Sequence, residues 1–97
     1  MNMEQLKDIR KLIELVIHAR IKADAKPHVN RLDFAVLHVK PTLDPYFAGK
    51  LREAATYAKE ASGQVRNKEH WISCMERSWY VFESHIRQKQ LNNSEKQ

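Results

Sequence analysis

The sequence predicts an all-α protein, a small antiparallel helical bundle of three long helices plus one short helix. Apolar residues recur about every 3.6 positions in the segments 3–23 and 67–89, as in helices that bury one face. The 97 residues include only two glycines and three prolines, so few positions favour a helix break. We expect a single helical domain over residues 1–90, followed by a flexible polar C-terminal tail at 91–97.

The first predicted helix covers residues 3–23. One arc of this helix is apolar and contains Leu6, Ile9, Leu12, Ile13, Val16, Ile17 and Ala19. Arg20 projects from the middle of the same arc. Either the buried part of the helix ends near Ala19, or Arg20 extends its charged end to solvent or pairs with a carboxylate.

Pro27 predicts a break at residues 25–29, because proline lacks a donor N–H and restricts the residue before it. Asn30 is suited to cap a following helix at 31–39. The run Phe34–Val39 is rich enough in β-forming residues to be a strand instead. An isolated strand would have no partner in this sequence, so we predict a short, largely buried helix and keep the strand as the alternative.

The third predicted helix has the clearest start in the chain. Asp44 supplies a capping carboxylate and Pro45 suits the first helical position, while Gly63 suits the end. Its apolar stripe is rich in alanine, which lets another helix approach closely. Gly49 inside this helix costs about 1 kcal/mol relative to alanine. We therefore expect close packing or a partner at Gly49.

The fourth predicted helix, at 67–89, is apolar over half of its circumference. This half contains Trp71, Ile72, Cys74, Met75, Ser78, Trp79, Val81, Phe82, His85 and Ile86. Such a face is wider than one neighbouring helix needs. It predicts contact with two helices, or with one helix and a second chain.

Composition excludes several classes of protein. The 17 basic and 12 acidic side chains give a net charge of +5, which mildly favours an anionic partner. Cys74 is the only cysteine, so no disulfide forms within the chain and a reducing, cytoplasmic location is expected. The charged start of the chain does not fit a signal peptide. No stretch reaches the roughly 18 apolar residues of a membrane span, so no membrane is expected.

Metal binding and catalysis find little support in the residues. His70 and Cys74 stand four positions apart, with His85 on the same side of the helix, but zinc requires three or four convergent ligands. Core packing is the better interpretation. Arg31 and His38 suggest a helical ribonuclease, although short Arg-to-His spacings arise often by chance in this sequence. We therefore expect no enzyme activity, no catalytic residues, no cofactor and no metal.

Nucleic-acid binding is the alternative function. Basic residues gather around the corner between the first two helices, and they include Lys7, Lys11, Lys22, Lys26 and Arg31. Such a surface would contact RNA or DNA phosphates without reading sequence. No helix carries the Arg, Asn and Gln set that reads base edges, and a solvated face explains the same charges.

Protein binding is the leading hypothesis. The candidate contact residues lie on the flank of the third helix and on the fourth, and comprise Tyr46, Lys50, Tyr57, Trp71, Trp79 and Tyr80. Tyrosine and tryptophan are enriched at interface hot spots, although core packing is the better interpretation of Trp71 and of Trp79 taken singly. We predict a non-enzymatic interaction module that binds a protein partner of acidic surface as adaptor, regulator or inhibitor, or that forms a homo-oligomer such as a dimer.

Overall fold

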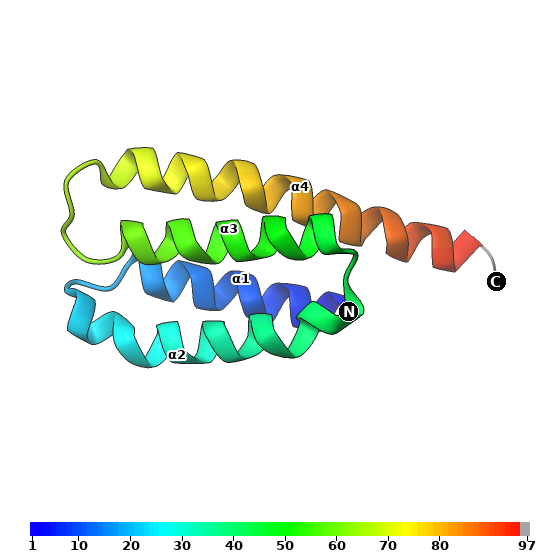
Figure 1. Cartoon of the computed structure of the whole chain (residues 1–97), viewed down its shortest axis with the longest axis horizontal. Helices are drawn as coiled ribbons and strands as arrows, with labels where there is room; N and C mark the ends of the chain where they lie inside the picture. The colour runs from blue at the N-terminus through cyan, green and yellow to red at the C-terminus, as the bar shows by residue number, and fades with distance from the viewer. Residues whose placement is uncertain (96–97) are drawn as a thin grey trace.

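The computed structural model describes residues 1–95 of the chain, with side chains described as far as residue 92. It contains four α-helices, namely α1 (Met3–Ile17), α2 (Lys22–Val39), α3 (Pro45–Ala61) and α4 (Lys68–Glu95) (Figure 1). A short 3-10 helix, η1 (Lys40–Thr42), follows α2. Residues 1–95 contain no strand. The predicted all-α bundle is confirmed, and residues 31–39 are helical.

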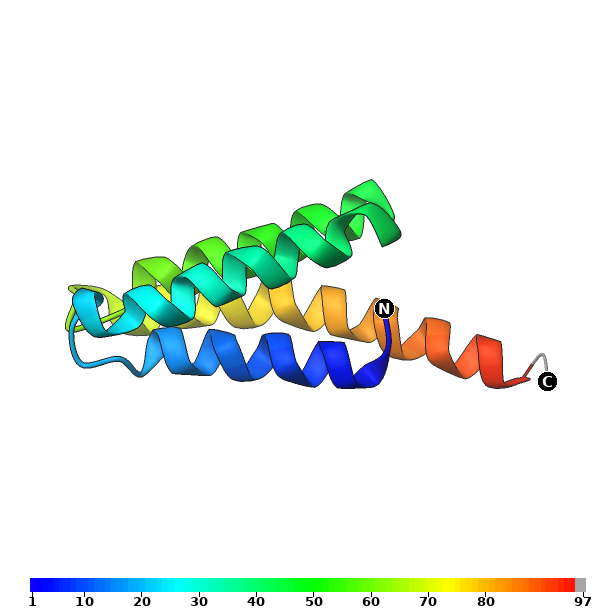
Figure 2. The ribbon, with the colours of Figure 1, turned by 90° about the horizontal axis from the view of Figure 1, so that it is seen from below.

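Successive helices run in alternating directions, so the chain forms an α1–α2 hairpin and an α3–α4 hairpin (Figure 1). α3 and α4 pack along much of their length, and α1 contacts both α2 and α3. Seen from below, α2 and α3 diverge from α1 toward the end of the molecule where α2 finishes (Figure 2). α4, at 28 residues, extends past the other helices and contributes to the length of 47 Å.

The core lies between the two hairpins and receives side chains from all four helices. Leu6 and Ile13 of α1, Leu32 of α2, Leu51 of α3 and Phe82 of α4 are almost completely buried. On α3 the core also contains small residues, which let the neighbouring helices approach closely; these are Ala54, Ala55, Ala58 and Ala61. This burial is the main stabilising term of the fold.

Two predicted helix boundaries are confirmed at α3. The Asp44 side chain accepts a hydrogen bond from the backbone N–H of Tyr46 at 2.9 Å, and Pro45 is the first helical residue. Gly63 follows the helix with φ of 76°, a left-handed conformation that glycine adopts at little cost.

α1 begins with a capping box in which Asn2 and Gln5 exchange hydrogen bonds of 2.8 and 2.9 Å.

The predicted end of the first helix at residue 23 is wrong. α1 ends at Ile17, and His18 is its C-cap. Arg20 lies exposed in the connection to α2, so of the alternatives for this residue the first is correct: the buried part of the helix ends before it.

The predicted break at 25–29 is also wrong. α2 begins at Lys22 and continues through Pro27, which makes it an 18-residue helix rather than a short one. Pro27 removes one backbone hydrogen bond. Ala25, Leu32 and Val39 repeat every seven residues and are all buried, and this burial outweighs the local loss.

The predicted C-terminal tail starts as helix. α4 continues to Glu95, so residues 91–95 are helical, and residues 96–97 lie outside the described part of the chain.

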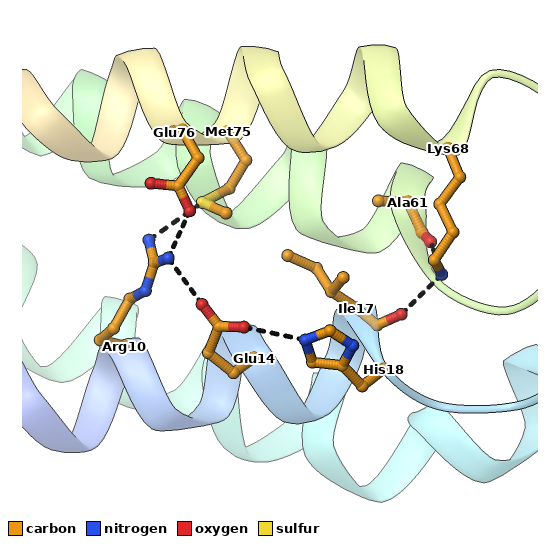
Figure 3. A network of polar contacts seen from close by, with 8 residues as sticks. All are labelled: Arg10, Glu14, Ile17, His18, Ala61, Lys68, Met75 and Glu76. Carbon is orange, nitrogen blue, oxygen red and sulfur yellow. Dashed lines mark hydrogen bonds and ion pairs between the residues drawn. The ribbon is translucent and has the colours of Figure 1, made fainter.

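A polar network joins α1 to α4 (Figure 3). Arg10 bridges two carboxylates, Glu14 of its own helix at 2.6 Å and Glu76 of α4. Its guanidinium also lies over the ring of Trp79, 5.6 Å from the centroid. His18 contacts the second oxygen of Glu14 at 3.1 Å. The network therefore orients the two helices and covers one face of the buried indole ring.

Lys68 connects three chain segments at the other end of the bundle (Figure 3). Its ammonium donates to the backbone carbonyls of Ile17, Ala61 and Gly63 at 2.7, 2.6 and 2.7 Å. Burial lowers the pKa of Lys68 below the usual 10.5, and the charge of Lys22 lowers it further. The carbonyls belong to the ends of α1 and α3 and to the turn after α3, so this one side chain ties those ends together.

Candidate protein-binding site

The side of α2 that faces away from the core carries exposed apolar residues. Consecutive helical residues are rotated by about 100°, so Phe34 and Leu37 lie opposite the buried stripe of Ala25, Leu32 and Val39. The side chain of Phe34 is 72% exposed and that of Leu37 is 67% exposed. They are on adjacent turns, so their side chains form one apolar surface rather than two isolated contacts.

Other residues extend this surface along α2. The rings of Phe34 and His38 stack with centroids 6.5 Å apart. Pro27 and Asn30 precede Phe34 on the same face, and both are exposed. We call the set Pro27, Asn30, Phe34, Leu37 and His38 the α2 outer face. The expectation that residues 31–39 would be largely buried is therefore wrong for this half of the helix.

A groove runs beside this face, between α2, η1 and α3. Its first hollow measures about 510 Å³ and is lined by Pro41, Leu43, Pro45, Ala48 and Gly49, with the cations of Lys40 and Arg52. The second hollow measures about 310 Å³, and its walls include Val36, Leu37, Ala55 and Thr56. Lys40 and Arg52 line both hollows, so they lie where the two meet. We call these two hollows together the α2–α3 groove.

Gly49 opens the wall of the first hollow. A Cβ atom built on Gly49 would have no other atom within 4 Å apart from its own helix and chain neighbours. Its backbone is not in the left-handed region, which among the glycines is adopted by Gly63. Neither conformation nor internal packing therefore requires glycine here. Of the two expectations for Gly49, close packing within the chain is wrong, and a partner remains a prediction.

The groove is positively charged. Lys59 forms an ion pair with Asp33 at the far side of the second hollow. Among the side chains described up to residue 92, neither Lys40 nor Arg52 has a carboxylate in ion-pair range. Two uncompensated cations thus border an apolar hollow, an arrangement suited to a ligand that is apolar and anionic at once.

The predicted aromatic flank of α3 and α4 separates into two pairs. Lys50 places its ammonium 5.5 Å from the ring centroid of the exposed Tyr46. Tyr57 stacks on Trp71 with centroids 6.0 Å apart, and both are partly buried. The first pair is accessible to a partner, whereas the second mainly covers the seam between the two helices.

The remaining aromatic candidates of α4 have opposite environments. Trp79 is 3% exposed and belongs to the core, so it is unavailable to a partner and its place among the contact residues was wrong. Tyr80 is 71% exposed. Being one residue further along the helix, it projects away from the side that packs on α3. The apolar face of α4 is wide because this helix contacts both α3 and α1.

The cations of the predicted basic corner do not all face the same way. Lys7, Lys11, Lys22, Lys26 and Arg31 are all exposed. Lys22 turns toward α3 and donates to the carbonyl of Lys59 at 3.2 Å. Lys11 instead lines a hollow between α1 and α2, which also contains the carboxylates of Glu14 and Asp24. The five cations therefore do not form one uninterrupted positive surface.

The three residues considered for metal binding, His70, Cys74 and His85, do not come together at one point. His70 Nε2 lies 3.7 Å from Cys74 Sγ, while His85 stacks on Phe47 with centroids 3.6 Å apart. In the described part of the chain, no group of three His, Cys, Asp or Glu residues is arranged to hold a metal ion. No helix within that part has the length and apolar character needed to cross a membrane.

The chain matches no protein-family model, no curated protein and no solved structure. Its function is therefore inferred from the chemistry of its surface. Phe34, Leu37, Lys40 and Arg52 are the residues that sequence reasoning missed. A helical projection begun at Lys22 instead of Arg31 would have found the first two, because it places them opposite Ala25.

Proposed function

We propose that this chain is a non-enzymatic interaction module that binds another protein, as an adaptor, regulator or inhibitor. The observation that carries the proposal is the exposure of Phe34 and Leu37 on one face of α2. Exposed apolar residues are common singly, but neighbouring large ones flanked by polar residues are typical of interaction sites.

Burial energy supports a contact at this face. Covering a large apolar side chain completely contributes about 1.5–3 kcal/mol. Phe34 and Leu37 together therefore offer binding energy of the size associated with a hot spot. The stacked imidazole of His38 supplies a polar edge to the same contact. Tyr46 and Lys50, on the outer side of α3, are candidates for the periphery.

The test is a comparison of three forms of the protein as bait in an extract of its native cells. Phe34→Asp/Leu37→Asp changes two exposed residues, so the fold should survive. Leu91→Asp is the matched control, since Leu91 is also a large, exposed apolar residue and lies on another helix, α4. We expect a defined polypeptide to be retained by the wild-type chain and by the control, and lost with the double variant. Equal retention by all three would contradict a contact at the α2 outer face.

The alternative, a basic protein that contacts RNA or DNA phosphates, is supported by the exposure of all five cations. Its signature is salt dependence, because phosphate contacts release counterions. A 260 nm absorbance that co-purifies with the chain and is removed by high salt would favour it. Charge reversal at Lys22 and Lys26 would then abolish binding, while Phe34→Asp/Leu37→Asp would hardly change it.

Self-association is the remaining form of the same proposal. A dimer that buries the α2 outer face would make the melting temperature rise with protein concentration. Light scattering of the wild-type chain and of Phe34→Asp/Leu37→Asp distinguishes a dimer through this face from a monomer that awaits another protein.

A further inference from the structure

We infer that the partner docks an acidic amphipathic α-helix in the α2–α3 groove. The inference rests on the proposed protein-binding function and adds the class of ligand. Three features of the groove carry it, namely its two apolar hollows, the cations between them, and the open wall at Gly49.

The walls of the groove favour a helix over an extended peptide. They are the sides of α2, η1 and α3, whose backbone N–H and C=O groups are largely used within the helices. An extended peptide would find few backbone partners there and would leave its own polar groups without hydrogen bonds. A helix satisfies its backbone internally and needs only a surface that accepts its side chains.

The spacing of the hollows matches the repeat of a helix. Ala48 lies in the first hollow and Ala55 in the second, seven residues further along α3. Seven residues correspond to about 10 Å along a helix axis. A helix lying along the groove would therefore place side chains i and i+7 in the two hollows. Its residues i+3 and i+4 would face the point where the hollows meet.

The charges at that point determine what residues i+3 and i+4 should be. Lys40 and Arg52 both border the junction, and neither has an ion pair with the side chains described up to residue 92. Glu or Asp in the middle of the docked helix would meet both cations, and an arginine can hold a carboxylate through two hydrogen bonds. A basic or neutral helix would leave these cations uncompensated as they lose solvent.

Gly49 gives the docked helix room to approach. Without a Cβ at this position, the backbone of α3 forms part of the wall of the first hollow. Glycine is the residue that permits another backbone to come close. A glycine that nothing in the fold requires, placed in the wall of the first hollow, is accounted for by a ligand that packs against it.

The experiment is a selection from a displayed library of amphipathic helices, with the full chain as target. Apolar residues are fixed in the library at i and i+7, and every polar position is free to be Glu, Lys or Gln. We expect the selected helices to carry acidic residues at i+3 or i+4. Selection of neutral or basic residues there, or no selection at all, would overturn the inference.

Variants of the chain establish where the selected helices bind. Arg52→Glu should weaken binding by about tenfold or more, as expected for loss of an interfacial charge pair. Gly49→Leu should fill the first hollow and have a similar effect. The matched controls are Lys7→Glu, which reverses a charge at an exposed position of α1, and Ser73→Leu, which places leucine at an exposed position of α4. Equal losses in test and control variants would also overturn it.

The same variants separate this inference from the proposed function. Phe34 lines neither hollow, whereas Leu37 lines the second, so Phe34→Asp alone tests the α2 outer face. Helices that lose affinity with Phe34→Asp but not with Arg52→Glu or Gly49→Leu would leave the α2 outer face as an interaction site and refute the groove. Helices insensitive to all of these variants would refute the groove, and the α2 outer face would then depend on the bait comparison alone. Dimers of the free chain that are broken by Gly49→Leu would show that a second copy fills the groove, and would refute the acidic helix.

Discussion

Gly49→Ala should stabilise the protein by about 1 kcal/mol, although alanine adds no internal contact. Gly49 lies inside α3, where glycine loses more backbone freedom on folding than alanine does. The added methyl group has no other atom within 4 Å, so it neither clashes nor fills a cavity. The whole gain therefore comes from the unfolded chain, whose conformational freedom is reduced.

Thermal unfolding followed by circular dichroism measures this effect. For a domain of this size, 1 kcal/mol corresponds to a rise of roughly 4–8 °C in melting temperature. The matched control is Gly63→Ala, for which the opposite sign is expected. Gly63 has φ of 76°, and a Cβ there would lie 3.2 Å from the backbone nitrogen of Lys22. A loss of about 1 kcal/mol or more should follow from the left-handed backbone alone.

A destabilising Gly49→Ala would refute the reasoning. It would mean that the space outside Gly49 is filled in the folded protein, and the first hollow of the α2–α3 groove would then be closed to a ligand. A neutral result would refute the stated magnitude but leave the open wall intact. Stabilisation by both glycine substitutions would instead contradict the left-handed turn after α3.

The other predictions concern the orientation of α2 and the role of Lys68. Leu32→Ala should lower the free energy of unfolding in urea by about 2–5 kcal/mol, because Leu32 is fully buried. The exposed Leu37→Ala should change it by less than about 0.5 kcal/mol, and comparable losses in the two variants would mean that α2 is rotated. Lys68→Met should cost about 2 kcal/mol by leaving three carbonyls without their donor, whereas Lys7→Met should be neutral. Lys22→Gln should raise the pKa of Lys68 in an NMR titration of its side chain, since it removes a neighbouring positive charge. Lys7→Gln is the control. An unchanged Lys68 pKa in Lys22→Gln would contradict the proximity of the two ammonium groups.

Local sequence pattern was enough to predict the helices that have a clear apolar stripe and a capping residue at their start. Asp44, Pro45 and Gly63 bound α3 as expected, because caps depend on neighbouring residues alone. The connection between α1 and α2 was not predictable in this way. Pro27 favours a break locally, and it is overruled by the burial of residues on either side of it, which depends on the tertiary fold.

The candidate site was predicted less well than the fold, for a related reason. Exposure of Tyr46 and Tyr80 followed from helical spacing, but the same reasoning could not distinguish Trp79 in the core from an interface residue. The α2–α3 groove was beyond the sequence, because Lys40 and Arg52 come from different helices and meet only after the hairpins pack. Charged residues that meet only in the folded protein leave no local pattern in the sequence.

Gly49 and Phe34, two residues that do not favour stability, both lie beside α2 and α3 in this small protein. The side where α1 meets α4 is well satisfied, with Arg10 bridging two carboxylates and covering Trp79. Beside α2 and α3, by contrast, a helix contains an unneeded glycine and Phe34 remains in water. Breaks in otherwise consistent local rules are expected where function requires them. Substitutions that optimise this side for stability, with Gly49→Ala first among them, should therefore weaken binding of an acidic helix, whereas equivalent changes on the α1–α4 side should not.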